Sequence, residues 1–147
     1  MYDELFMKRA VEVSARALSE AGAAPFGAVV VREGKVVAEG LNQVMGRFDP
    51  TSHSEVEAIR AACVALQTTD LSDCELYTSC EPCTMCVATI MLSRVGRVYY
   101  GASLQQSGKA LAGLPRPVPI HALRKEEALP IAERALPAEQ KLDAEAV

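Results

Sequence analysis

Apolar residues recur at helical spacing at the start of the chain. Gly22 and Pro25 follow this segment and are typical of a helix end. The pattern predicts an amphipathic helix from Tyr2 to about residue 21. The apolar residues on its expected buried face are Leu5, Phe6, Ala10, Val13, Ala17 and Leu18.

Two valine-rich runs come next and are joined by a short polar sequence. The first run covers residues 27–32 and the second covers residues 36–42, with Glu33, Gly34 and Lys35 between them. β-branched residues favour strands, and a turn sequence between two such runs is typical of a β-hairpin. We therefore expect a hairpin over residues 27–42.

The middle of the chain alternates between loop, helix and strand patterns. Residues 45–52 contain Gly, Asp, Pro and Ser and predict a loop, which opens into a helix from His53 to about residue 66. Residues 74–79 have the composition of a strand. Another helix is expected to run to about residue 93, with Pro82 at its first position. The buried stripe of the helix over residues 53–66 consists of Val56, Ile59, Cys63 and Leu66.

The remaining patterns complete a layered domain. Residues 96–101 predict a buried strand, and residues 118–123 predict a last strand that Pro119 favours at a sheet edge. Residues 124–136 favour a helix that Pro130 interrupts. This order of helices and strands predicts an α/β layered domain. A chain of 147 residues suffices for one domain with a core, but not for two ordinary ones.

Composition and charge narrow the classes of protein. Half of the residues are apolar, yet no run of about 18 uncharged apolar residues exists, so the sequence predicts no membrane span. The N-terminal segment carries charges throughout and does not look like a signal peptide, so we expect a cytoplasmic protein. The net charge of −4 and the lack of a dense Lys/Arg cluster weigh against a nucleic-acid partner.

The cysteines point to metal binding rather than to disulfides. The chain has five of them, and Cys80, Cys83 and Cys86 lie too close together for a disulfide framework in a cytosolic chain. Cys83 and Cys86 are three residues apart, so on a helix both sulfurs lie on one face. A position near the start of that helix favours thiolates.

One histidine can complete a zinc site with these two cysteines. A catalytic zinc ion usually has three protein ligands and an open position. His53 precedes the cysteine pair by thirty residues and would be the third ligand. The other histidine, His121, lies in an expected edge strand without another type of ligand nearby.

A Cys-x-x-Cys pair alone also fits half of a structural zinc ribbon or a redox dithiol. The ribbon needs a second pair, and Cys63 and Cys74 are too far apart in sequence to form one. A redox motif is typical of a thioredoxin-like setting without a His-x-Glu sequence upstream. The combination with His53 and Glu55 therefore favours a catalytic zinc site.

Glu55 raises a geometric question. Residues two apart on a regular helix point to nearly opposite sides, so His53 and Glu55 share a site only if His53 stands at the helix start. Otherwise Glu55 is an ordinary acid of the first turn. In the catalytic interpretation, zinc acidifies a bound water, and Glu55 moves protons from it to a ring nitrogen and to the leaving amine. The products are a carbonyl compound and ammonia, which makes the protein a hydrolytic deaminase.

The stretches DPTSHSEVEAIRAA and LYTSCEPCTMC resemble the cytidine deaminase superfamily. Within it they are most similar to the bacterial guanine deaminases and the tRNA adenosine deaminases, and the likeness covers about residues 25–101. It implies a three-layer α/β/α fold with a central mixed sheet of about five strands flanked by helices. We expect a single deaminase domain over residues 1–147, with a core of about 1–101 and a divergent C-terminal segment, 102–147.

The resemblance also implies roles for individual residues. Zinc, with its bound water or hydroxide, would lie on His53, Cys83 and Cys86, and Glu55 would be the catalytic proton shuttle.

Two further residues match positions that contact the substrate in relatives. Asn42 matches an asparagine that hydrogen-bonds the base, and Phe26 falls where relatives line the base pocket. Relatives are commonly dimers or larger, and the apolar segment 84–92 agrees with a homodimer or a higher homo-oligomer.

The expected substrate is a small heterocyclic base, with conversion of guanine to xanthine as the first hypothesis. Residues 77–82 and Phe26 are similar to the guanine deaminases, and the acidic charge argues against tRNA. Three features depart from relatives: Ser54 replaces an alanine, Thr84 replaces a proline, and residues 102–122 contain no acidic or aromatic group. The alternatives are a tRNA adenosine-to-inosine deaminase, a cytosine or aminated triazine deaminase, and a catalytically inactive zinc-containing binding protein.

Overall fold

The computed structural model describes residues 1–103 of the chain. The helices expected at the N-terminus and after residues 53 and 82 are confirmed, as are the hairpin and the strands that begin near residues 74 and 96. The elements in chain order are α1 (Glu4–Ala15), the 3-10 helix η1 (Arg16–Leu18), β1 (Ala24–Arg32), β2 (Lys35–Asn42), α2 (Val44–Arg47), α3 (Ser54–Leu66), β3 (Cys74–Cys80), α4 (Thr84–Leu92) and β4 (Arg97–Ala102).

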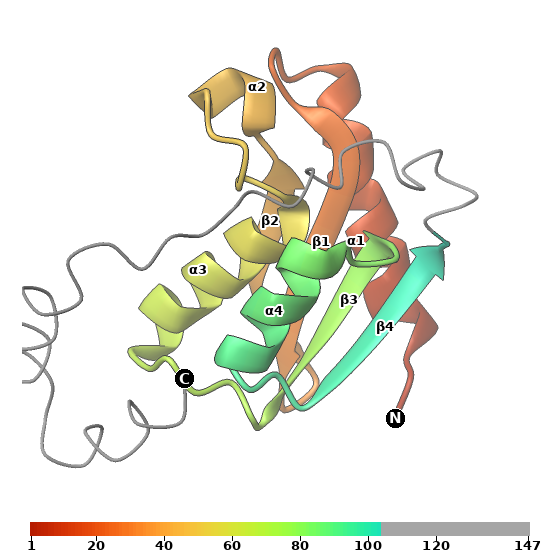
Figure 1. The fold of residues 1–147 in the computed structure, drawn as a ribbon. Coiled ribbons are helices and arrows are strands. Elements are labelled where there is room, and N and C mark those ends of the chain that lie inside the picture. The colour runs from red at the N-terminus through yellow and green to blue at the C-terminus, as the bar shows by residue number, and fades with distance from the viewer. Residues whose placement is uncertain (104–147) are drawn as a thin grey trace, which may run out of the picture. The chain divides into compact units, whose positions relative to one another are not determined.

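The strands form a mixed sheet in the order β2-β1-β3-β4 (Figure 1). β1 pairs antiparallel with both β2 and β3, whereas β3 and β4 are parallel and are connected through α4. The described sheet has four strands in place of the predicted five or so. The last expected strand, residues 118–123, and the helix expected after it lie outside the described residues.

Helices cover both faces of this sheet, which confirms the predicted three-layer α/β/α fold. One core cluster lies between the sheet and α1, and it includes Val13 of α1, Val29 of β1 and Tyr77 of β3. The other lies on the opposite face, where Ile59 of α3 and Leu76 of β3 are buried together. In Figure 1, α3 and α4 lie side by side on that second face.

Two glycines let the helices approach the sheet closely from opposite sides. A Cβ atom on Gly27 of β1 would collide with the α1 backbone at Ser14 and Ala10. A Cβ atom on Gly40 of β2 would collide with the α3 backbone at Ser54 and Ala58. Gly40 therefore sets the position of the first turns of α3.

The predicted stripe of α1 is wrong at two positions. Leu5 and Leu18 are 72% and 90% exposed, whereas Ala10 and Val13 are fully buried. Leu5 lies about 100° around the helix from its neighbour Phe6, which packs against the core. The backbone changes from α to 3-10 geometry after Ala15, and this change of period turns Leu18 away from the buried face.

Three other local expectations also need correction. Residues 45–52 are not entirely loop, because the short helix α2 includes their first three positions. Pro82 does not begin the third predicted helix, α4, since Cys83 is its N-cap and Thr84 its first residue. β4 is not buried along its length, and Tyr100 is 50% exposed, because β4 is the outermost strand of the described sheet.

None of the helices within residues 1–103 has both the length and the apolar character needed to cross a membrane.

Candidate active site

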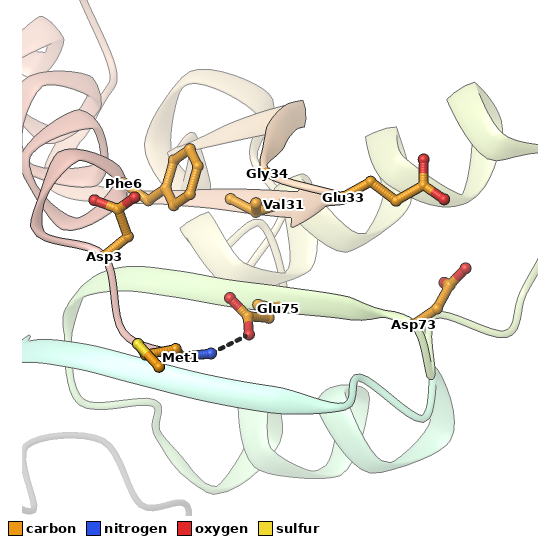
Figure 2. Close-up of a pocket in the computed structure, with 8 residues that line it drawn as sticks. All are labelled: Met1, Asp3, Phe6, Val31, Glu33, Gly34, Asp73 and Glu75. Carbon is orange, nitrogen blue, oxygen red and sulfur yellow. Dashed lines mark hydrogen bonds and ion pairs between the residues drawn. The ribbon is translucent and has the colours of Figure 1, made fainter.

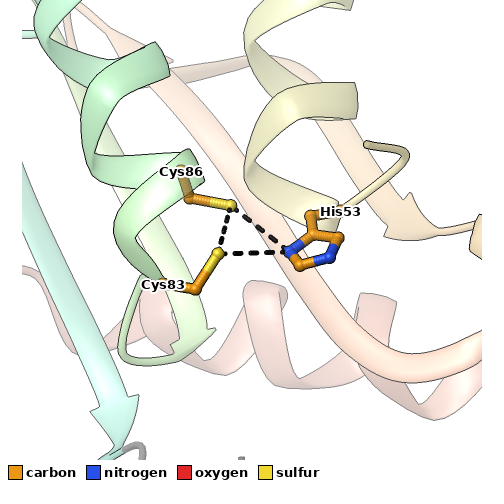
Figure 3. A group of neighbouring side chains, drawn as sticks. All are labelled: His53, Cys83 and Cys86. Atoms are coloured by element: carbon orange, nitrogen blue, oxygen red, sulfur yellow. Dashed lines mark hydrogen bonds between the residues drawn. The ribbon is translucent and has the colours of Figure 1, made fainter. Parts of the chain in front are cut away.

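Two of the predicted zinc ligands are the N-cap residues of neighbouring helices. His53 precedes α3 with φ −74° and ψ 156°, and Cys83 precedes α4 with φ −72° and ψ 171°. Both backbones are extended, and neither side chain caps its own helix. The two side chains turn instead toward one another and toward Cys86, which is on the first turn of α4 (Figure 3).

The distances within this cluster suit a tetrahedral zinc ion. His53 Nδ1 lies 3.5 Å from Cys83 Sγ and 3.5 Å from Cys86 Sγ, and the two sulfurs are 3.6 Å apart. Zinc–sulfur and zinc–nitrogen bonds of ordinary length at tetrahedral angles require separations of about 3.8 Å between sulfurs and about 3.6 Å between sulfur and nitrogen. His53, Cys83 and Cys86 therefore fit the ion and leave its fourth position open.

The protonation state of Cys86 depends on a bound cation. Burial raises the pKa of the Cys86 thiol, and the negative charges of Glu55 and Cys83 raise it further. A zinc ion held between these groups would supply positive charge that favours the thiolate.

Glu55 lies next to the cluster because α3 begins immediately after His53. Its Oε2 atom is 3.4 Å from Cys86 Sγ, and its side chain is almost completely buried. The extended backbone of His53 and the helical backbone of Glu55 turn both side chains toward the same sulfur. This arrangement confirms the predicted helix start at His53 and answers the geometric question that the spacing of the two residues raised.

The two predicted substrate-binding residues lie at the same end of the β1–β2 hairpin. Ala24 pairs with Asn42 and Gly27 pairs with Leu41, so Phe26 is part of an irregular segment opposite Asn42. Asn42 is buried, and its Oδ1 accepts a hydrogen bond from the Val44 amide at 3.2 Å.

A backbone contact links this hairpin end to the start of α3. The amide of Gln43 donates a hydrogen bond to the carbonyl of Ser52 at 2.9 Å. Asn42 comes one residue before Gln43, and His53 comes one residue after Ser52, so this hydrogen bond holds both residues close together.

A family comparison agrees with this geometry. Residues 1–102 match the family described as the cytidine and deoxycytidylate deaminase zinc-binding region. The chain belongs to this family. Its class is thus a zinc-dependent hydrolase that acts on C–N bonds, as the sequence predicted.

Individual members of the family are similar over most of the chain. A guanine deaminase of Bacillus subtilis (strain 168) is 46% identical over 110 residues, which are 75% of this chain and 70% of that protein. A tRNA-specific adenosine deaminase of Aquifex aeolicus (strain VF5) is 41% identical over 108 residues, 74% of this chain and 71% of that protein. A solved structure of guanine deaminase from Bacillus subtilis has a TM-score of 0.79 and 36% identity, and the match covers 94% of this chain and 97% of that one.

Two hydroxyl residues of this deaminase contact Glu55, and neither was predicted from the sequence to be a site residue. Ser54 Oγ is 3.1 Å from Glu55 Oε2, and Thr78 Oγ1 is 3.0 Å from Glu55 Oε1. The alternation of β3 contains a signal for Thr78, because it shares a strand face with the apolar residues Cys74 and Leu76. The contact of Ser54 has no comparable signal, since it depends on how the first turn of α3 packs.

The structure also has an acidic cavity of about 360 Å³ that includes none of the predicted site residues (Figure 2). Three of its four acids have structural partners: Asp3 caps α1, Glu75 pairs with the N-terminal ammonium group, and Asp73 pairs with Arg32. The residues that line it are Met1, Asp3, Phe6, Val31, Glu33, Gly34, Asp73 and Glu75.

Proposed function

We propose that this deaminase acts on a free nucleobase or a similar small heterocycle. The leading candidate is guanine, which it would convert to xanthine. The observation that carries the proposal is the buried carboxylate of Glu55, 3.4 Å from a sulfur of the zinc-binding cluster. The similarity to guanine deaminases supports guanine in particular.

In the proposed reaction, the residues of the site have different roles. His53, Cys83 and Cys86 would hold zinc, which would supply an acidified water as the nucleophile. Glu55 accepts a proton from that water, delivers it to a ring nitrogen of the base, and helps to protonate the leaving amine. The helix starts at His53 and Cys83 direct backbone N–H groups and positive dipole ends toward the site, where they favour developing negative charge.

Asn42 and Phe26 would position the base. A buried Asn side chain offers both donors and an acceptor, so Asn42 can hydrogen-bond the edge of a purine. Phe26 is half-buried and offers an apolar ring against which a flat heterocycle can pack.

The proposal is tested by ammonia release from the purified, zinc-loaded protein. The panel contains guanine, cytosine, adenine, their nucleosides, an aminated triazine and tRNA. We expect the highest kcat/KM with guanine. Turnover of another free base would replace guanine as the substrate, and no release from any free base would overturn the proposal.

A tRNA adenosine deaminase is the second candidate, because tRNA-specific enzymes are similar over almost the same share of the chain. It predicts inosine in an anticodon and RNA binding that weakens steeply with salt. The net charge of −4 favours the small substrate, since tRNA binding requires several phosphate-neutralising cations.

A catalytically inactive zinc-containing binding protein is the alternative outside the enzymes. It predicts that Glu55→Ala leaves every function unchanged, whereas the deaminase proposal predicts near-complete loss of turnover with zinc retained. Glu57→Gln is a matched control, because Glu57 is an acid of the same helix turn that hydrogen-bonds Ser52 and Arg47. We expect this control to keep most of the activity.

We also propose that the protein is a homodimer, that it is cytoplasmic, and that it acts in purine metabolism. α4 exposes apolar side chains that a second copy would cover: Val87 is 44%, Met91 72% and Leu92 85% exposed. Light scattering at micromolar concentration tests the dimer, and a monomeric mass would contradict it. Fractionation of cells tests the compartment.

A further inference from the structure

Both oxygens of the Glu55 carboxylate have a hydroxyl partner. Thr78 Oγ1 lies 3.0 Å from Oε1, and Ser54 Oγ lies 3.1 Å from Oε2. Ser54 and Thr78 are fully buried, and Glu55 is 2% exposed. A charged group removed from water needs such donors, so the two hydroxyls stabilise the carboxylate in its position.

These hydrogen bonds leave Glu55 able to react. An ionised carboxylate has about four acceptor positions, two on each oxygen. Each hydroxyl uses one position, and a zinc-bound thiolate at Cys86 donates no proton to Oε2. One acceptor position per oxygen therefore remains for the water and for the substrate.

Thr78 differs from Ser54 in having a second acceptor within reach. Its Oγ1 atom is also 3.1 Å from the carbonyl oxygen of Cys80. One hydroxyl has one proton, so Thr78 donates either to Glu55 or to Cys80 at a given moment. Within residues 1–103, the Ser54 hydroxyl forms a hydrogen bond with Glu55 alone.

These two contacts place the Thr78 oxygen between the Glu55 carboxylate and the backbone of β3. The Cys80 carbonyl belongs to the same strand as Thr78, whereas Ser54 is simply the residue before Glu55 on α3. Thr78 therefore ties the position of the carboxylate to the sheet.

We propose that Thr78 is a positioning residue for Glu55, and that its hydroxyl, which lies between the Glu55 carboxylate and the Cys80 carbonyl, fixes the carboxylate relative to β3. This inference rests on the proposed deamination, because it assigns to Glu55 the role of proton shuttle. The alternative is that Thr78 has only a packing role on β3 beside Leu76. In that case valine would replace it without loss of activity.

Steady-state kinetics separate these two roles. Thr78→Val keeps the shape and removes the hydroxyl, and we expect kcat to fall roughly 10- to 100-fold with KM and zinc content unchanged. Thr78→Ser restores the hydroxyl, and we expect it to recover kcat to within about threefold of the wild type. Ser54→Ala is expected to lower kcat clearly less than Thr78→Val does.

Three kinetic outcomes would overturn the proposal. They are a Thr78→Val enzyme with normal kcat, a Thr78→Ser enzyme as defective as Thr78→Val, and equal losses for Thr78→Val and Ser54→Ala. Thr68→Val is the control, because the Thr68 hydroxyl accepts a hydrogen bond from the Asp70 amide, and Thr68 is not among the predicted site residues. It should lower stability without changing kcat or KM.

A second measurement needs no substrate. We expect Thr78→Val to lower the midpoint of urea unfolding of the zinc-loaded protein, because it leaves a buried carboxylate without one donor. In a Glu55→Ala background the same substitution should lower the midpoint by less than half as much. Equal decreases in both backgrounds would show that the contact between Thr78 and Glu55 does not contribute to stability, and would overturn the proposal.

The two measurements distinguish failure of this inference from failure of the proposed function. If the unfolding midpoints show coupling and no free base releases ammonia, the proposed function fails and the Thr78–Glu55 contact stands. If guanine is deaminated and Thr78→Val is unimpaired, the function stands and the role of Thr78 fails.

Discussion

The start of α1 and the starts of α3 and α4 are built in different ways. Asp3 caps α1, and its Oδ1 atom accepts a hydrogen bond from the Leu5 amide at 2.9 Å. α3 and α4 begin at His53 and Cys83, which make no side-chain cap. A side-chain N-cap stabilises a helix by about 1 kcal/mol, so the two helices on the site face lack this stabilisation. Their first side chains form the zinc-binding cluster instead.

The two faces of the sheet also bury different groups. Beneath α1 the core is apolar apart from Tyr77, whose hydroxyl reaches Asp3 at the edge. Beneath α3 the sheet buries Glu55 together with Ser54 and Thr78. The α1 face therefore serves stability, and local rules of folding hold there. The opposite face departs from those rules at the zinc-binding cluster and at the buried Glu55.

Cys83→Ser is the change with the largest expected effect on this comparison. Serine is a favoured N-cap and a poor zinc ligand, so zinc binding and activity should be lost. The metal-free variant should nevertheless be more stable than the metal-free wild type by about 1 kcal/mol, because α4 gains a cap. Metal analysis, ammonia release and urea unfolding with a chelator measure the three effects. A metal-free variant less stable than the metal-free wild type would break the comparison.

Gly40→Ala and Gly27→Ala make the same substitution on the two faces of the sheet, so their effects can be compared directly. Each added Cβ collides with a helix backbone, that of α3 at Gly40 and that of α1 at Gly27. Both variants should lose roughly 1–3 kcal/mol of stability because a helix must shift. Only the shift of α3 moves His53 and Glu55, and a displacement of about 1 Å can cost about 100-fold in kcat. Urea unfolding and kcat measure both. A greater loss of kcat in Gly27→Ala would contradict the assignment of the site to the α3 face.

The cluster of His53, Cys83 and Cys86 could be predicted from the sequence because local spacing singles out these residues. Cys83 and Cys86 share a helix turn wherever that helix lies, and only one histidine has a Glu two residues later. The start of α3 at His53 was predicted from the loop composition of residues 45–52, and the structure confirms it.

Other features depend on tertiary contacts and could not be predicted in the same way. Thr78 meets Glu55 only because β3 turns that residue toward α3, and no local pattern specifies which helix covers which face. The burial of Leu18 was predicted wrongly because the change to 3-10 geometry after Ala15 has no clear signature in the sequence. The helix start at Cys83 rather than Pro82 reflects the extended backbone that brings its sulfur to His53.

Asp3→Ala tests the other side of the comparison. Removing the cap of α1 should cost about 1 kcal/mol of stability, since one helical N–H group loses its partner. Zinc content, kcat and KM should stay at wild-type values, because α1 packs on the face away from the site. Urea unfolding and steady-state kinetics check both parts. Asp3→Asn is the control and should keep most of the stability, because asparagine is also a favoured cap. A loss of zinc in Asp3→Ala would mean that the two faces are not independent.

The last prediction concerns Tyr77, the buried polar group of the α1 face, and its effect appears only at high pH. Burial raises the pKa of Tyr77 from 10.0 to about 12, and the negative charge of Glu75 adds to the shift. Below pH 10 the tyrosine is protonated in both the folded and the unfolded chain, so its contribution to stability is fully present. Between pH 10 and pH 12 the unfolded chain releases this proton first, and stability falls by up to about 1.4 kcal/mol per pH unit. Tyr77→Phe removes this dependence, so its free energy of unfolding should fall less steeply over that range. Parallel curves for the two proteins would mean that Tyr77 is not buried as a neutral phenol beneath α1.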